Sequence, residues 1–374
     1  MCAVEWKKLG DVIQVLRGRR LTKTELLEEG QYKVFHGGLE PLGYYNLNNR
    51  EADSVMVINV GASAGTVGYC DSDFWSSDGC FTLSKNPLFL PKYIYCYLKQ
   101  EECKISSKVR KAGIPTLDAK VIEDIYIPLI PITKQQEIVS HLDTFTTLIS
   151  NLESELDMRR KQYEHYRNQL LDFEGVEGVE WKTLGKICEI KGRIGFRGYT
   201  RDDQVEKGEG AIALTATNIV NQKINYDNCT YISWFKYEES PEIKVNIGDI
   251  ILCQRGSIGK VAIVKELPER ATINPQLLLL KNISCYNYFL IYYLCSAYFQ
   301  KQLFGIIGHG TIQMISQRDL SSLCIPIPPL NTQQEIVSKL DVFEKLIQSL
   351  EQEIKLRKQQ YEYYREKLLT FEKE

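Results

Sequence analysis

The sequence predicts two mixed α/β domains joined by two long helices that pair as an antiparallel coiled coil. Residues 127–174 align without a gap onto residues 325–372, with identical residues at 27 of 48 positions. Both stretches carry an apolar seven-residue repeat, which is typical of coiled coils. The segments that precede them differ in sequence but share the same order of strand-like runs, glycine turns and a helix. A duplicated chain of this kind predicts a pseudo-two-fold molecule.

The first domain is expected at 1–130. A strand candidate, SVMVINV (54–60), leads into a glycine-serine turn, GASAGTVG (61–68). Apolar β-branched runs that end in glycine are typical of strand ends. A helix is expected near 91–100, followed by a glycine-threonine turn, KAGIPTL (111–117).

The first long helix is expected at 131–174 and the second at 327–374, with a linker at 175–178. Apolar residues alternate at spacings of four and three over about five heptads, which predicts a left-handed coiled coil. About 40 helical residues would extend roughly 60 Å. Prolines lie just before each helix start, and Gly175 lies where a C-terminal cap is expected. Pairing between two chains is the alternative to pairing within one.

The predicted seam has one arginine at the same place in each helix, which either fixes the register or extends to solvent. The seam residues are Ile138, Leu142, Phe145, Ile149, Leu152, Leu156, Arg159 and Tyr163 in the first helix, and Ile336, Leu340, Phe343, Ile347, Leu350, Ile354, Arg357 and Tyr361 in the second.

The second domain is expected at 179–326. Its strand candidate DIILCQ (249–254) leads into RGSIGKVA (255–262), so that Ser257 aligns with Ser63 of the first domain. One helix is expected at 286–303, with its aromatic stripe facing the core, followed by GHGTIQMI (308–315).

The two domains begin with related segments, VEWKKLG (4–10) and VEWKTLG (179–185). The linker FEGVEGVEW (173–181) also resembles the chain's own end joined to its beginning. We therefore expect the termini to lie near each other, in a quasi-circular arrangement.

Composition indicates an ordinary globular protein, with 44% hydrophobic and 25% charged residues. The sequence has neither a signal peptide pattern nor an apolar run long enough to span a membrane, so a cytoplasmic protein without membrane contact is expected. Eleven cysteines without a CxxC pair indicate reduced thiols, and four scattered histidines argue against a metal site. Charge is uneven, because 131–178 has five basic and nine acidic residues whereas 179–326 has 17 and 14.

Basic residues recur at matching positions after the WKxLG segments, with glycine and aromatic residues between them. Glycine-rich basic loops allow close approach to phosphates, and arginine can also read guanine in the major groove. A solvated charged face is the alternative, and for the turn residues a purely structural role is equally compatible. The candidate DNA-contacting residues are Arg17, Arg19, Arg20, Lys23, Ser63, Thr66, Lys108, Arg110, Lys111, Lys191, Arg193, Arg197, Arg201, Ser257, Lys260, Thr311 and Gln313.

No catalytic site is predicted. NPLF (86–89) approaches the NPP(Y/F) signature of adenine methyltransferases, but it has Leu88 in place of the second proline. GSIGK (256–260) resembles a phosphate-binding loop, but it lacks the first glycine and is followed by Val261 instead of serine or threonine.

A family resemblance rests on the paired IPxxPxxxQQEIVxxLD segments (127–143 and 325–341), on the duplicated VEWKxLG starts and on the two turns in each insert. Along its whole length, the chain resembles the specificity subunit of Type I restriction–modification systems. The resemblance implies two target recognition domains, each reading half of a bipartite, asymmetric site in double-stranded DNA. It also implies that the helices set the spacer length and dock two methyltransferase subunits. Those subunits would bind S-adenosylmethionine, with restriction–translocase subunits joining for cleavage, while this chain would bind no cofactor.

Two other classes of function are compatible with these patterns. A coiled-coil regulatory or scaffold protein would bind DNA without methyltransferase partners, and an enzyme would have an active site that no motif reveals. Methylation of DNA by the purified chain alone would favour the enzyme.

Overall fold

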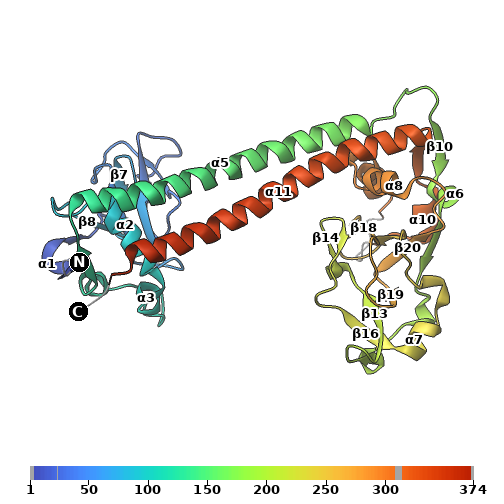
Figure 1. The fold of residues 1–374 in the computed structure, drawn as a ribbon, viewed down its shortest axis with the longest axis horizontal. Coiled ribbons are helices and arrows are strands. Elements are labelled where there is room, and N and C mark those ends of the chain that lie inside the picture. The colour runs from blue at the N-terminus through green and yellow to red at the C-terminus, as the bar shows by residue number, and fades with distance from the viewer. Residues whose placement is uncertain (1–3, 23, 308–313, 372–374) are drawn as a thin grey trace. The chain divides into compact units, whose positions relative to one another are not determined.

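The computed structural model describes residues 4–22, 24–307 and 314–371, and the chain divides into two compact units (Figure 1). Unit 1 comprises 1–155 and 351–374, and unit 2 comprises 156–350. Each unit contains one mixed α/β domain together with part of both long helices, which confirms the predicted fold class. The domains expected from the sequence end where the long helices begin, whereas the two units divide within those helices. The expected boundaries therefore stay a prediction.

Unit 1 is built around a four-stranded antiparallel sheet and a smaller three-stranded sheet. The first has the order β2 (Val15–Leu16), β8 (Cys80–Leu83), β5 (Ser54–Ile58), β6 (Val67–Cys70). The second has the order β4 (Gly43–Tyr45), β3 (Tyr32–Phe35), β7 (Phe74–Ser76), with β3 and β7 parallel. A separate pair joins β1 (Glu5–Lys8) to β9 (Tyr126–Leu129). The helices of this domain are α1 (Leu9–Val12), α2 (Pro91–Gln100), α3 (Glu102–Ser107) and α4 (Ala119–Glu123).

Unit 2 repeats this plan although its sequence differs. Its antiparallel sheet has the order β11 (Glu189–Gly192), β20 (Leu277–Lys281), β17 (Ile250–Cys253), β18 (Val261–Ile263). Its second sheet has the order β12 (Gln204–Val205), β16 (Thr230–Ser233), β13 (Gly210–Leu214), β19 (Ala271–Ile273). The start pair is β10 (Glu180–Thr183) with β21 (Cys324–Ile327), and a hairpin joins β14 (Ile219–Val220) to β15 (Lys223–Ile224).

The helices of unit 2 are α6 (Leu184–Ile187), α7 (Trp234–Glu238), α8 (Asn287–Leu294), α9 (Ala297–Gly305) and α10 (Gln317–Ser322). Short 3-10 turns lie at Gly195–Arg197, Arg201–Asp203, Ala216–Asn218 and Pro241–Ile243.

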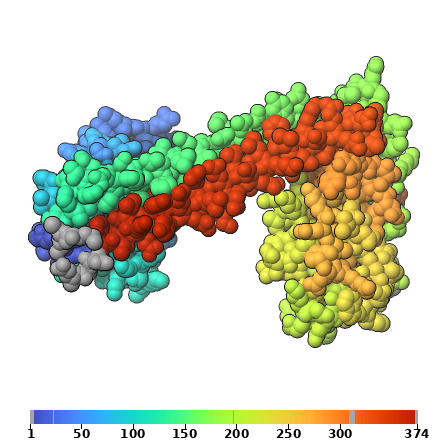
Figure 2. Space-filling view, viewed as in Figure 1, coloured from blue at the N-terminus to red at the C-terminus, as the bar shows by residue number. Residues whose placement is uncertain are grey.

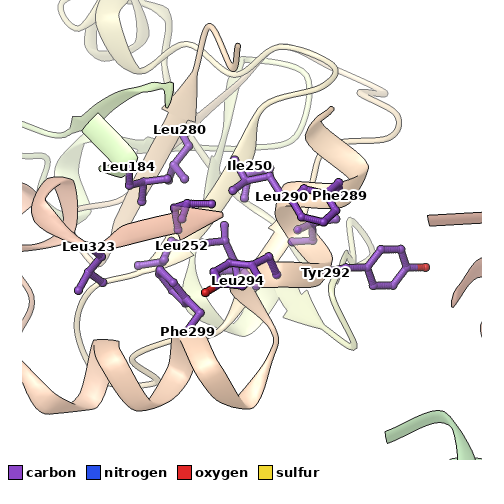
Figure 3. Close-up of a cluster of buried hydrophobic side chains, with 14 of the residues drawn as sticks. Leu184, Ile250, Leu252, Leu280, Phe289, Leu290, Tyr292, Leu294, Phe299 and Leu323 are labelled. Atoms are coloured by element: carbon purple, nitrogen blue, oxygen red, sulfur yellow. The ribbon is translucent and has the colours of Figure 1, made fainter. Parts of the chain in front are cut away.

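The aromatic segment 286–303 forms two helices where one was predicted. Ser296 begins α9 as its N-cap, because its hydroxyl accepts a hydrogen bond from the backbone of Phe299. The expected core role of the aromatic residues is confirmed, since Phe289, Tyr293 and Phe299 are fully buried in one cluster with residues of β17 and β20. Figure 3 shows Phe289 and Phe299 in this cluster. Burial of aromatic side chains of this size is a large part of what holds such a domain together.

The long helices are α5 (Ile132–Leu170) and α11 (Leu330–Leu369). Within unit 1, Lys358 forms an ion pair with Glu153 at 2.6 Å, and Phe145 stacks on Tyr364 with ring centroids 5.3 Å apart. Residue numbers rise on one helix as they fall on the other, so the two helices run antiparallel. The end of α5 at Leu170 corrects the predicted cap, because Gly175 lies beyond the helix in a linker turn, with a φ of 73°.

The contacts between the two long helices in unit 2 correspond to those in unit 1 at equivalent positions of the repeat. Tyr166 stacks on Phe343 with ring centroids 5.4 Å apart, and these residues align with Tyr364 and Phe145. The same pair, with the helices exchanged, therefore occurs in each unit, which is what a pseudo-two-fold duplication predicts.

The residues predicted to form the seam are all buried or half-buried, and some of them also belong to the core of a domain. Ile138 and Leu142 belong to the core of the first domain, and Ile336 and Leu340 belong to the core of the second. Arg159 and Arg357 each donate a hydrogen bond to the glutamine three residues further on, at 3.0 Å. The seven-residue repeat thus serves two purposes, domain packing near each helix start and helix pairing further along.

A buried glutamine joins each helix to its domain. The amide of Gln135 donates to the carbonyl oxygens of Leu88 and Ile130 and accepts from the backbone of Leu90, at the start of α2. Gln333 makes the equivalent bonds to Pro328 and Tyr286, at the start of α8. These two glutamines are the first of each QQEIV sequence.

A second pair of side chains ties each long helix to the helix that it covers. Lys92 of α2 forms an ion pair with Asp143 of α5 at 3.0 Å. Tyr292 projects from α8 away from the sheet (Figure 3), and its hydroxyl donates to Asp341 of α11 at 2.6 Å. Asp143 and Asp341 are equivalent in the repeat, so the same position of each long helix is tied to its domain, by a lysine in the first and a tyrosine in the second.

Both ends of the described chain pack in unit 1. Val4 and Trp6 lie against the same apolar cluster as Leu369 and Phe371, so the expected proximity of the two ends is confirmed for these residues. No helix in the described part of the chain is long and apolar enough to cross a membrane.

Candidate nucleic-acid interface

The glycine-serine turn and the glycine-threonine segment of the first domain lie side by side. Gly61 donates its backbone N–H to the carbonyl oxygen of Pro115 at 2.9 Å, and Leu117 donates to that of Asn59 at 2.8 Å. The glycine-serine turn follows β5, and the glycine-threonine segment is hydrogen-bonded to residues 59–61 just after the end of that strand. We call the corresponding end of each four-stranded sheet the turn edge. It comprises 17–20, 59–66, 76–79 and 110–117 in the first domain, and 193–201, 254–260, 274–276 and 314–315 in the second.

The second domain repeats this arrangement with different side chains. Ile315 donates its backbone N–H to the carbonyl oxygen of Gln254 at 3.0 Å, as Leu117 does to Asn59. Within the turns, Gly65 donates to Ile58, and Gly259 donates to Cys253. These bonds agree with the alignment of Gly65 on Gly259, but the second turn is one residue shorter, because Gly65 lies seven residues after its acceptor and Gly259 lies six after its own.

Both turns need glycine for backbone reasons. Gly65 and Gly259 have φ values of 93° and 84°, a region that residues with a Cβ rarely adopt. A Cβ on Gly65 would also lie 2.8 Å from Cα of Ser106. The glycines thus set the turn, and the side chains between them are presented at the turn edge.

The arginine loop of the first domain is held by its backbone. Arg19 donates its N–H to Ser76 at 2.9 Å, and its carbonyl oxygen accepts from the indole of Trp75 at 2.8 Å. Gly18 is required here, because a Cβ would lie 1.9 Å from the carbonyl oxygen of Ser77. The side chains of Arg17, Arg19 and Arg20 are exposed. A fixed backbone with exposed guanidinium groups is suited to contact phosphates.

Arg50, which sequence reasoning did not single out, supports this loop from beneath. Its guanidinium donates to the hydroxyl of Thr82 and to the carbonyl oxygen of Arg17. Burial lowers the pKa of Arg50 below its usual value. It lies outside the basic clusters in the sequence, so no pattern of charge could have identified it.

Arg193, which the sequence placed among the candidate DNA-contacting residues, has the same supporting position in the second domain. It is only 7% exposed, and its guanidinium donates to Ile273, to Thr272 and to the carbonyl oxygen of Arg197. Burial lowers its pKa, and it lies over the ring of Tyr199. In this position its hydrogen bonds are directed into the domain, not toward a ligand.

The other candidates differ in exposure. Lys191 and Arg197 are half-buried and form ion pairs with Glu189 and Glu242. Ser63, Thr66 and Ser257 are half-buried in their turns. The exposed candidates are Lys108, Arg110, Lys111, Arg201 and Lys260. Lys23, Thr311 and Gln313 lie outside the described residues.

The turn edge of the second domain has a further exposed cation, Arg255, which was missed. It lies directly before Gly256, and a guanidinium nitrogen is 3.3 Å from the sulfur of Met314. Its place in RGSIGK was the available signal, because that glycine turn presents its neighbours to solvent.

The two motifs that resemble catalytic signatures have structural roles. In NPLF, the Asn86 side chain donates to Val12 and accepts from Leu88, and so forms a turn before α2. GSIGK is the turn between β17 and β18. Among the described residues, no group of three potential metal ligands gathers.

Comparison with known proteins identifies the same organisation. The family model for the Type I restriction modification DNA specificity domain matches residues 3–158 and again 177–356. The chain is 34% identical, over 64% of its length and 60% of the relative's, to a specificity subunit of an Escherichia coli Type I restriction enzyme. It is 23% identical to the Type I restriction enzyme MjaVIII specificity subunit of Methanocaldococcus jannaschii, over 98% of this chain and 91% of that one.

Solved structures agree at the level of the fold. A Type I restriction–modification S subunit from M. genitalium aligns with all of this chain and 98% of its own, with a TM-score of 0.63 and 17% identity. A chain from a study of complex assembly in the type I R-M system aligns with a TM-score of 0.65 at 16% identity, over 99% of this chain and 98% of that one. With the family model matching both halves, the chain belongs to the family of Type I restriction–modification specificity subunits.

Proposed function

We propose that each domain reads one half of a bipartite, asymmetric site in double-stranded DNA through its turn edge. Specificity subunits select the DNA and are themselves non-catalytic. The observation that carries the proposal is the repeated turn edge, in which the same backbone hydrogen bonds present different side chains. The two domains have the same backbone arrangement at the turn edge but different side chains. They therefore offer different hydrogen-bonding groups to the base edges, which favours two different half-sites.

The exposed cations at the turn edges supply the contacts that do not depend on sequence. Arg17, Arg19 and Arg20 in the first domain and Arg201, Arg255 and Lys260 in the second are placed to neutralise phosphates. Contacts of this kind position a protein on the duplex without selecting its sequence. The chain as a whole carries a formal charge of −2, so we expect its partners to supply much of the affinity.

The long helices would set the spacer between the half-sites and dock two methyltransferase subunits. In Figure 2, the face of α11 that is turned toward the viewer is not covered. Exposed apolar residues on this helix, among them Val342 and Leu356, are 64% and 52% exposed. In the complex, the methyltransferase subunits would bind S-adenosylmethionine and methylate adenine, and restriction–translocase subunits would join for cleavage.

Methylome sequencing tests this proposal. The chain is expressed with its partner methyltransferase in a host that lacks adenine methylation of its own. We expect methylation at one motif made of two unlike half-sites and a spacer of fixed length. A single continuous motif, or methylation that is identical without this chain, would overturn the proposal.

A further inference from the structure

The second domain has a hairpin where the first domain has a short connection. Strands β3 and β4 are joined by residues 36–42, whereas the equivalent strands β13 and β16 are joined by 215–229, which include β14 and β15. The turn at the tip of this hairpin consists of Asn221 and Gln222.

We propose that this hairpin enters the major groove of the second half-site and that the amide of Gln222 reads an adenine there. The inference rests on the proposed function, and it names a residue that determines specificity. A two-stranded β-ribbon fits the major groove, and a glutamine amide can both donate to and accept from an adenine edge.

The base of the hairpin is held by several hydrogen bonds. Asn218, which is 4% exposed, donates its side-chain amide to the carbonyl oxygen of Asn225 at 3.1 Å. Asn225 returns a backbone hydrogen bond to Asn218 at 2.8 Å, and Thr215 donates its N–H and its hydroxyl to the Asn218 side-chain oxygen. A tip on a fixed base can place a side chain with the accuracy that base reading requires.

The backbone of the tip favours glycine at the position that glutamine occupies. Asn221 and Gln222 have φ values of 48° and 62°. Two successive residues with positive φ form the tight hairpin turn in which asparagine followed by glycine is preferred. Asparagine tolerates this region, but glutamine has no such advantage. A turn requirement alone therefore does not explain Gln222, whereas a need for its side chain does.

The hairpin also borders the turn edge. Residues 219–222 line a cavity of about 410 Å³ together with Gly259, Lys260 and Val261 of the turn edge and its neighbouring strand. Cys295 and Gln300 complete the lining. Lys260 is the charged residue of this lining, which contains no carboxylate, and Lys223 beside the tip is exposed. Gln222 is half-buried at this cavity, and no hydrogen bond to another described residue engages its amide.

The test compares Gln222→Gly and Gln222→Glu with the wild type by methylome sequencing with the partner methyltransferase. The wild-type second half-site is expected to contain an A·T pair whose selection depends on Gln222. Gln222→Gly should lose the discrimination at that position, roughly 5- to 150-fold for one bidentate contact. Gln222→Glu should shift the preference toward C·G, because a carboxylate accepts from the cytosine amino group. The first half-site should not change.

Asn282→Gly is the matched control, because Asn282 also has a positive φ, of 50°, but lies at the other end of β20 from the turn edge. It should keep the wild-type motif. Thermal unfolding of Gln222→Gly should occur at or above the wild-type temperature, since glycine suits the turn.

An unchanged second half-site in folded Gln222→Gly would overturn the inference, as would a uniform loss of methylation without a change in the preferred base. Unfolding of Gln222→Gly below the wild-type temperature would contradict the argument from the turn. If the wild type itself shows no bipartite motif, the proposed function fails, and the hairpin inference fails with it.

Discussion

Residues that look alike in the sequence have different roles at the turn edges. Arg19 and Arg193 both lie in basic, glycine-rich stretches, yet one side chain is exposed and the other is 7% exposed. The difference arises from Thr272 and Ile273, which accept hydrogen bonds from Arg193 and are distant in the sequence. The sequence therefore predicted where basic residues gather, but it could not tell a buried, supporting arginine from an exposed one.

This difference predicts that substitution of one arginine affects DNA binding and substitution of the other affects stability. Arg19→Ala should weaken DNA binding by the complex and reduce the slope of log affinity against log salt by about 1, as loss of one phosphate contact does. Its thermal unfolding should match the wild type. Titration of labelled duplex at several salt concentrations measures the slope, and an unchanged slope would exclude a phosphate contact by Arg19.

Arg193→Ala should instead destabilise the second domain by about 1–3 kcal/mol, because it leaves buried acceptors without a partner. Denaturant unfolding of the purified chain measures this loss. A folded Arg193→Ala variant that unfolds like the wild type would contradict the supporting role.

The doubled glutamine of QQEIV offers a sharper comparison within one motif. Gln135 is fully buried and makes three hydrogen bonds to backbone, whereas Gln136 is exposed. Gln135→Ala should lower the free energy of unfolding by about 1–3 kcal/mol, since the carbonyl oxygens of Leu88 and Ile130 lose their donor. Gln136→Ala should leave the free energy of unfolding unchanged within the error of the same denaturation experiment. Equal losses from both substitutions would contradict the role of the Gln135 hydrogen bonds as a clamp between helix and domain.

At the scale of elements, a long helix can be predicted from its seven-residue repeat more reliably than the elements against which it packs. The heptads identified α5 and α11, because a seven-residue repeat needs a facing helix. Their antiparallel pairing was predicted from the duplication of the chain. They could not show that Ile138 and Ile336 pack into the domains, since a core and a partner helix both favour the same apolar residues. The break at Ser296 was missed because a local cap ended an otherwise apolar helical pattern.

The helices predict how spacer length depends on their own length. Insertion of one heptad into α5 and one into α11 at facing positions preserves the seam and adds about 10 Å to each helix. We expect the spacer of the methylated motif to lengthen by about 3 base pairs, with both half-sites unchanged. Methylome sequencing of the lengthened chain measures the spacer, and a variant that folds but keeps the wild-type spacer would reject the idea that the helices set it.

At the scale of the whole molecule, duplication separates what the two halves share from what distinguishes them. The shared parts are the helix pairing, the glutamine clamps and the backbone of the turn edge, and all of these have counterparts in both units. The distinguishing parts are the turn-edge side chains and the β14–β15 hairpin. Because the helices and the turns repeat in the sequence, they could be predicted. The role of the glutamines was not predicted, and the hairpin has no counterpart in the first domain.

The central claim is that the two domains read their half-sites independently. The most direct measurement replaces residues 179–326 with the corresponding domain of another specificity subunit and maps the methylated motif with the partner methyltransferase present. The account predicts that one half-site changes to that of the donor while the other half-site and the spacer are kept. A hybrid that methylates DNA but changes both half-sites, or neither, would contradict it.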